Sequence, residues 1–105
     1  MKIRIRSTSS VTDGLRGHIG RRLNSALARF RGHVDDVQVR LSDVNGPRGG
    51  VDKRCRLVLS ASRGDVLVAE GRAPNFYQAV DLATNRAARS VRRVSAAPHT
   101  MRRSA

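Results

Sequence analysis

The chain has 105 residues and carries 21 Lys or Arg against 8 Asp or Glu, which gives a formal net charge of +13. A compact domain with this imbalance repels itself, so the charge favours a polyanionic partner, most often a nucleic acid. A single cysteine excludes an internal disulfide and a cysteine-based metal site, and no apolar run has the length of a signal peptide or a membrane span, so we expect one soluble, cytoplasmic domain without membrane contact.

The first elements in chain order are a strand and a helix. Between Lys2 and Ser7, Ile3 and Ile5 alternate with basic residues, which is typical of a half-buried strand. Thr12 is a good N-cap, and large apolar residues then recur at helical spacing, so a helix is predicted from about Asp13 to Arg31. Three glycines weaken its interior, namely Gly14, Gly17 and Gly20.

Three more strands are predicted after this helix. They cover Val37 to Leu41, Arg54 to Leu59 and Val66 to Gly71. The turn formers of Asn45 to Gly50 join the first two of them, and a tight turn over Ser62 to Asp65 joins the last two. The side chains of the last two strands that we expect to face the core are Cys55, Leu57, Leu59, Leu67 and Ala69.

The last predicted element is a second helix, capped by Asn75. Its apolar stripe consists of Phe76, Val80, Ala83, Ala87, Val91 and Val94. We therefore expect a domain over residues 1–94 and a disordered basic tail over residues 95–105.

The predicted order is β-α-β-β-β-α. Short loops between the last three strands indicate antiparallel hairpins, whereas the helix after the first strand allows a right-handed parallel crossover. The expected fold is an α+β two-layer sandwich, a four-stranded sheet with two helices packed on one face. The opposite face of the sheet is then polar and presents Lys2, Arg4, Arg6, Arg40, Arg54 and Arg56.

No pattern of a catalytic or ligand site is recognisable. The histidines at positions 18, 33 and 99 form no metal-binding pair four residues apart, and no nucleophile elbow is present. The glycine-rich segment 46–50 lacks the spacing of a phosphate-binding loop and joins two strands. We therefore predict no enzyme, no metal, no cofactor and no small-molecule substrate. Cys55 lies in an alternating apolar run and is interpreted as a buried core residue, the alternative being a reactive thiol.

The candidate RNA-binding residues are arginines, because guanidinium groups suit phosphates and RNA shape. Arg86, Arg89 and Arg93 share one face of the second helix, and Arg22 and Arg29 are expected to share a stripe with His18 on the first. We expect both stripes to line one surface, the alternative being solvated helix faces. The full candidate set is Arg4, Arg16, Arg22, Arg29, Arg86, Arg89, Arg92 and Arg93.

Two other residues of the second helix have assigned roles. Tyr77 beside Phe76 is interpreted as partly core, with base stacking as the alternative. Asp81 is the one acidic residue of this helix, and we expect it to order the local backbone near the helix start instead of contacting RNA.

Two motifs carry a resemblance to a known family. The first is Thr12-Asp13-Gly14-Leu15-Arg16 followed by Arg21-Arg22-Leu23, and the second is Phe76-Tyr77-Gln78-Ala79-Val80-Asp81-Leu82-Ala83 with basic residues after it. With the order of elements, they resemble the ribosome hibernation-promoting factor family, which includes the ribosome-associated translation inhibitors. The chain is similar to the short members, which lack an extra C-terminal domain.

The resemblance implies a monomer that binds the small ribosomal subunit, and its rRNA, near the decoding site. There it would block mRNA and tRNA and keep idle ribosomes inactive, without chemistry. Two alternatives remain open at this point. One is a general double-stranded RNA-binding module, and the other is a transcription regulator that binds a protein and exposes an apolar patch.

Overall fold

The computed structural model describes residues 1–30, 32–44, 52–61 and 64–96. Its elements are β1 (Lys2–Ser7), α1 (Asp13–Ala26), the short 3-10 helix η1 (Ala28–Phe30), β2 (Val34–Asp43), β3 (Lys53–Ala61), β4 (Val66–Ala73) and α2 (Phe76–Ala96). The predicted order β-α-β-β-β-α is confirmed. The predicted turn over Asn45 to Gly50, the first half of the turn at Ser62 and the predicted tail from residue 97 onward lie outside the described residues.

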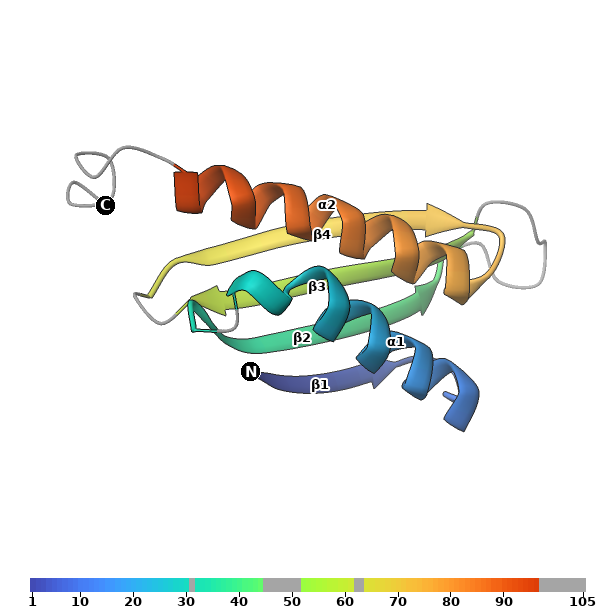
Figure 1. Cartoon of the computed structure of the whole chain (residues 1–105). Helices are drawn as coiled ribbons and strands as arrows, with labels where there is room; N and C mark the ends of the chain where they lie inside the picture. The colour runs from blue at the N-terminus through green and yellow to red at the C-terminus, as the bar shows by residue number, and fades with distance from the viewer. Residues whose placement is uncertain (31, 45–51, 62–63, 97–105) are drawn as a thin grey trace.

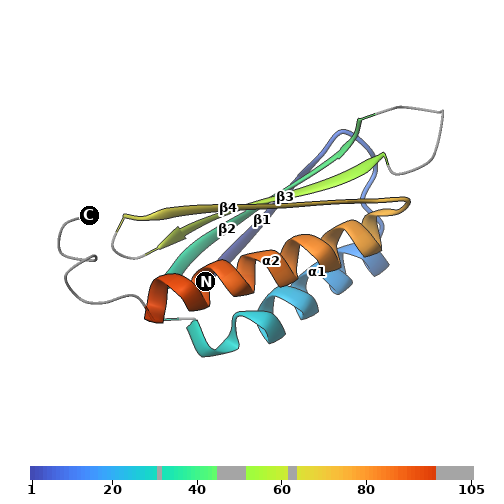
Figure 2. The same cartoon turned by 90° about the horizontal axis from the view of Figure 1, so that it is seen from above.

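The four strands form one sheet in the order β1-β2-β3-β4, and both α-helices cover the same face of it (Figures 1 and 2). β1 pairs with β2 in parallel, while β2–β3 and β3–β4 are antiparallel. The helix between β1 and β2 supplies the connection that a parallel pair needs. The two-layer α+β sandwich predicted from the sequence is therefore confirmed.

The core lies between the sheet and the two helices. Alternation along the strands turns one set of side chains toward the helices, and Cys55, Leu57 and Leu59 of β3 are 0–1% exposed, as predicted. On β4, Ala69 is buried and Leu67 is partly buried. The helices contribute Leu15, Ile19, Leu23, Leu27, Val80, Ala83, Ala87 and Val91. Of the described helices, none combines the length and apolarity that crossing a membrane requires.

The predicted end of the first helix at Arg31 is wrong. α1 ends at Ala26, Leu27 is its C-cap, and η1 follows, with the amide of Phe30 donating to the carbonyl of Leu27 at 2.9 Å. A 3-10 turn brings residues three apart onto the same side, so Leu27 stays buried and Phe30 still packs against the core. The apolar spacing fits either helix type, and the sequence pattern alone therefore missed the change.

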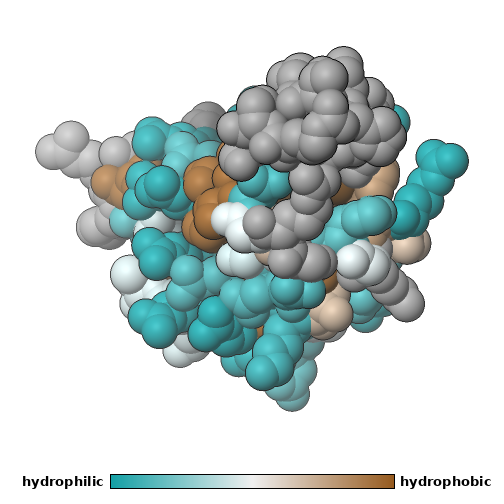
Figure 3. Space-filling model, turned by 90° about the vertical axis from the view of Figure 1, so that its left-hand side faces the viewer, coloured by the Kyte–Doolittle hydropathy of each residue, from teal (hydrophilic) through white to brown (hydrophobic). Residues whose placement is uncertain are grey.

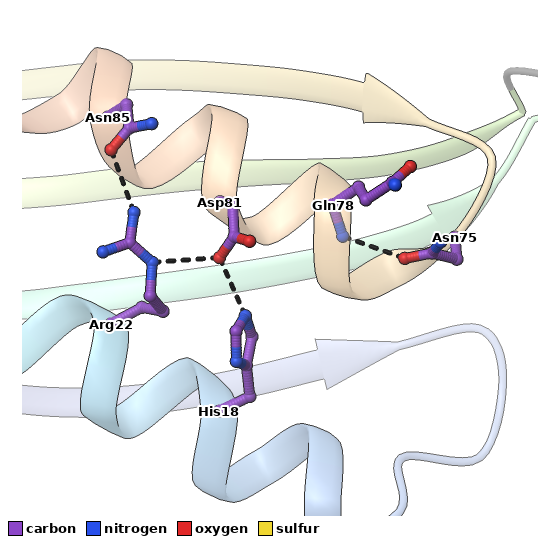
Figure 4. Close-up of polar contacts among 6 residues, drawn as sticks. All are labelled: His18, Arg22, Asn75, Gln78, Asp81 and Asn85. Carbon is purple, nitrogen blue, oxygen red and sulfur yellow. Dashed lines mark hydrogen bonds and ion pairs between the residues drawn. The ribbon is translucent and has the colours of Figure 1, made fainter.

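α2 begins as predicted and ends later. The side-chain Oδ1 of Asn75 accepts the amide of Gln78 at 2.9 Å, which confirms the predicted N-cap (Figure 4). The helix continues through Ser95 and Ala96, two residues into the segment predicted to be disordered. It packs so closely on β4 that a Cβ built on Gly71 would lie 2.6 Å from the carbonyl oxygen of Ala79. Gly71 thus permits the contact between the two layers.

Candidate nucleic-acid interface

The helical layer carries most of the unbalanced charge. Within α1, η1 and the described part of α2 there are eight arginines against two aspartates, whereas the four strands carry eight basic against four acidic residues. Figure 3 views the end of the molecule at which α2 finishes, where hydrophilic residues cover most of the described surface. The helical layer is therefore the first place to look for a polyanion.

A polar cluster joins α1 to α2, and we call its four residues the helix clasp: His18, Arg22, Asp81 and Asn85. The same oxygen of Asp81, Oδ1, accepts Nε2 of His18 at 2.8 Å and Nε of Arg22 at 2.9 Å. Nη2 of Arg22 also donates to Oδ1 of Asn85 at 2.9 Å. Figure 4 shows the two α1 side chains reaching across to α2. The clasp fixes the guanidinium of Arg22 between the helices.

The sequence spacing explains how the clasp forms. His18 and Arg22 are four residues apart on α1, as are Asp81 and Asn85 on α2, so each pair lies on one helix face. The role predicted for Asp81 is wrong, because its carboxylate binds side chains of α1 instead of local backbone, and it is the sixth residue of α2. The matched four-residue spacings are the signal that sequence reasoning missed.

Tyr77 extends the polar junction between the helices. Its ring lies 5.0 Å from the imidazole of His18, centroid to centroid, at an interplanar angle of 54°. A Cβ built on Gly14 would lie 3.0 Å from the Tyr77 hydroxyl, so that glycine leaves room for it. Tyr77 is nevertheless 43% exposed, more open to solvent than the predicted core role requires.

The arginines of α2 lie on one continuous helix but have different surroundings. Nη1 of Arg86 donates to the backbone carbonyl of Glu70 on β4 at 2.7 Å. Arg89, Arg92 and Arg93 are exposed, and within the described residues they make no hydrogen bond or ion pair. We call these last three the α2 arginine group. Its guanidinium groups are free to meet phosphates without breaking a protein contact.

The structure does not bring all the predicted helix arginines onto one surface. Arg22 faces the junction with α2, whereas Arg86 leans onto β4 on the other flank of that helix. Arg29 lies on η1 and not on α1, so the two arginines do not belong to one continuous α-helix as predicted. Arg16 and Arg29 are both exposed. The predicted common stripe of Arg22 and Arg29 therefore stays a prediction.

Arg4 of β1 differs from the α2 arginine group because it is already paired with an acid. Its Nη2 lies 2.6 Å from Oδ2 of Asp36 on β2, and this hydrogen bond and the charge of Asp36 raise the pKa of Arg4. A phosphate would compete with that carboxylate. Arg4 is therefore a weaker candidate than an unpaired arginine.

The described residues offer little for covalent or metal chemistry. No group of three potential metal ligands occurs among them. Cys55 is buried, as predicted, and burial raises the pKa of its thiol to about 12, which keeps it protonated at neutral pH. What this arrangement can do is bind an anion through fixed and free guanidinium groups.

Comparisons with known proteins give a consistent result. A family model described as Sigma 54 modulation protein / S30EA ribosomal protein matches residues 2–97. The chloroplastic ribosome-binding factor PSRP1 of Spinacia oleracea is 30% identical over 86 residues, which are 80% of this chain but 28% of that protein. This chain thus spans well under half the length of that relative.

Two solved structures share the fold. A ribosomal subunit interface protein from Coxiella burnetii superimposes with a TM-score of 0.77 at 16% identity, covering 92% of this chain and 100% of the other. The N-terminal domain of Protein Y from Thermus thermophilus superimposes with a TM-score of 0.68 at 22% identity, covering 89% and 94%. At identities this low, the two superpositions show that the arrangement of the sheet and helices is shared, and they carry no argument beyond the fold.

Proposed function

Since the chain belongs to the Sigma 54 modulation protein / S30EA ribosomal protein family, we propose that it is a ribosome-binding factor that silences idle ribosomes. The family predicted from the motifs of the two helices is confirmed by this membership. The spinach relative is named for ribosome binding and the Coxiella relative for a ribosomal subunit interface. Both names support a ribosomal partner for this chain.

The proposed site of action is the small subunit near the decoding region, where a bound domain occludes mRNA and tRNA. The mechanism is steric and needs no bond to be made or broken. Ribosomal RNA presents closely spaced phosphates, and arginine forks bind them through charge and paired hydrogen bonds. We infer that the chain acts as a monomer in the cytoplasm.

The observation that carries this proposal is the unpaired α2 arginine group. The acids on the described helices are few, and Asp81 is occupied by the helix clasp. The positive charge of Arg89, Arg92 and Arg93 is thus uncompensated within the described chain and available to rRNA. Because Tyr77 is the one exposed aromatic residue among the described ones, base stacking contributes less than phosphate contacts do.

The test is co-sedimentation of the purified chain with separated small subunits, large subunits and an RNA duplex, at 50 and 200 mM salt. We expect saturable binding to the small subunit that survives the higher salt and is not displaced by the duplex. Equal binding to all three, lost at the higher salt, would refute the ribosomal function and support a general double-stranded RNA-binding module.

A variant with the α2 arginine group changed to glutamine locates the surface. Loss of three phosphate contacts reduces the salt slope by about 2 to 3, so the wild-type chain should lose roughly 20–40-fold more affinity than the variant over this fourfold rise in salt. The matched control removes the same charge from three arginines that are paired with acids, since Arg4 pairs with Asp36 and both Arg54 and Arg72 pair with Glu70. Equal losses in both variants would mean that the α2 arginine group is not the preferred surface.

A protein partner is the second candidate function, because β4 exposes two large apolar side chains. Val66 is 58% exposed and Val68 is 50% exposed, both on the sheet face away from the helices. Such a pair is a small version of the apolar patch that a protein-binding regulator requires. Failure to sediment with either subunit, together with loss of RNA binding at 200 mM salt, would favour this function.

A further inference from the structure

The open face of the sheet carries a row of three arginines on neighbouring strands. In the observed register, Arg6 of β1 lies opposite Arg40 of β2, and Arg40 lies opposite Arg56 of β3. All three side chains are exposed and point away from the core, because their strand neighbours Ile5, Val39 and Leu57 point into it. We call Arg6, Arg40 and Arg56 the arginine row.

The arginine row is not neutralised by the rest of the described chain. Arg6 and Arg56 make no ion pair or hydrogen bond there, and Arg40 donates only to the neutral side chain of Gln38, at 3.1 Å. The next position of the row, on β4, is Glu70, but its carboxylate lies 3.6 Å from Arg72 and 4.0 Å from Arg54. Glu70, the acid nearest to the row in the strand register, therefore pairs with arginines outside the row.

The stability of the sheet does not explain why three arginines lie side by side in the arginine row. Like charges directly opposite each other on paired strands are destabilising, and neighbouring strands lie only about 4.8 Å apart. Charged residues often protect the edge of a sheet from pairing with another chain. That explanation fits Arg6 on the edge strand β1 but not Arg40 and Arg56, which lie on the two central strands.

We propose that the arginine row is a second RNA-binding surface, which holds the sugar-phosphate backbone of an RNA segment separate from the one bound by the helices. A backbone of phosphates removes the repulsion within the row, so its charge complements the face. This face has no aromatic side chain on the described strands, so it offers no platform for stacked bases and reads the backbone regardless of sequence.

The two proposed RNA-binding surfaces lie on different faces of the domain. The helices cover one face of the sheet and the arginine row lies on the other, so the thickness of the domain separates the two surfaces (Figure 2). One chain can therefore hold two RNA segments at once. This goes beyond occlusion of a single channel, and it does not depend on the small subunit being the partner.

The test is a bridging assay with two short RNA duplexes of unrelated sequence, one carrying biotin and the other a fluorophore. The wild-type chain should retain the fluorescent duplex on streptavidin beads at 50 mM salt. Changing the arginine row to glutamine should reduce retention at least about tenfold while one duplex still binds, because the helix surface remains intact. Changing the α2 arginine group should also abolish bridging, since one surface then remains.

Two controls separate this proposal from its alternatives. The variant of the arginine row should melt at the wild-type temperature or above it, because a repulsive row has been removed, so lost bridging cannot reflect unfolding. Light scattering shows whether the chain is monomeric, because a dimer with one surface per chain would also bridge. Undiminished bridging by the variant of the arginine row would overturn the proposal, whereas failure of the helix variant alone to change RNA binding would count against the proposed function instead.

Discussion

The helix clasp gives the sharpest link between the folded structure and RNA binding, and Asp81→Asn tests it. The substitution keeps the shape of the side chain and removes the charge that holds His18 and Arg22. Asp81 is half exposed, at 42% for its side chain, so each of its two contacts is worth roughly 0.2–1 kcal/mol. We expect a loss of about 1 kcal/mol of unfolding free energy, which lowers the melting temperature of a domain of this size by roughly 4–8 °C.

The assay is a double-mutant cycle on urea unfolding with Asp81→Asn, Arg22→Gln and both together. The contact at 2.9 Å predicts a coupling free energy of about 0.5–1 kcal/mol between the two residues. His18→Gln in the same background separates the imidazole contact from the guanidinium contact. A coupling free energy below about 0.3 kcal/mol, the usual limit of additivity, would refute the clasp.

Asp81→Asn should also change the affinity for an RNA duplex and the affinity for the small subunit by different factors. Removal of an acid from the helical layer adds one net positive charge, so affinity for an RNA duplex at 50 mM salt should rise and its salt slope should steepen by up to about 1. Release of Arg22 from its fixed position should weaken binding to the small subunit relative to the duplex. If both affinities rise by the same factor, the clasp does not position Arg22 for a specific surface.

Four further substitutions test the fold around the candidate surfaces. Gly71→Ala should cost at least about 1–3 kcal/mol in urea unfolding, because its Cβ would lie 2.6 Å from the carbonyl oxygen of Ala79, whereas Gly20→Ala, with open space around it, should stabilise by up to about 1 kcal/mol. Asn75→Ala removes the cap of α2 and should lower the melting temperature by an amount equivalent to about 0.5–2 kcal/mol. Burial raises the pKa of the Cys55 thiol from an ordinary 9.0 to about 12. The protonated thiol therefore contributes fully to the unfolding free energy below pH 9, and this contribution is lost as the pH rises toward 12. Unfolding free energy should then fall by up to about 4 kcal/mol more in the wild-type chain than in Cys55→Ala over that range, and an equal fall would contradict the assignment.

The layers of the fold could be predicted from the sequence because apolar residues recur at every second position of β1, β2 and β3. Cys55, Leu57 and Leu59 identify the buried face of β3 without reference to any other strand. The end of α1 could not be predicted in the same way. Leu23, Leu27 and Phe30 are spaced by four and then three residues, which satisfies an α-helix and a 3-10 turn alike.

The candidate site was predictable in its residue types but not in its pairings. A net charge of +13 and helix spacing were enough to select the arginines of α2. Which arginines are already occupied depends on contacts between distant segments, such as Arg22 with Asp81, 59 residues apart, and Arg4 with Asp36, 32 residues apart. Only the packed structure distinguishes these from the free guanidinium groups of the α2 arginine group.

The arginine row shows the same limit, because alternation places Arg40 and Arg56 outward but only the register makes them neighbours. The same strand pair provides an internal comparison. Three positions along, Asp43 lies opposite Lys53, and their side chains form an ion pair at 2.9 Å. The β2–β3 ladder thus uses opposite charges where a cross-strand pair stabilises the sheet and like charges at the position of the row. Two central strands that place like charges opposite each other, three positions from a pair that does the reverse, favour an external anion at the row.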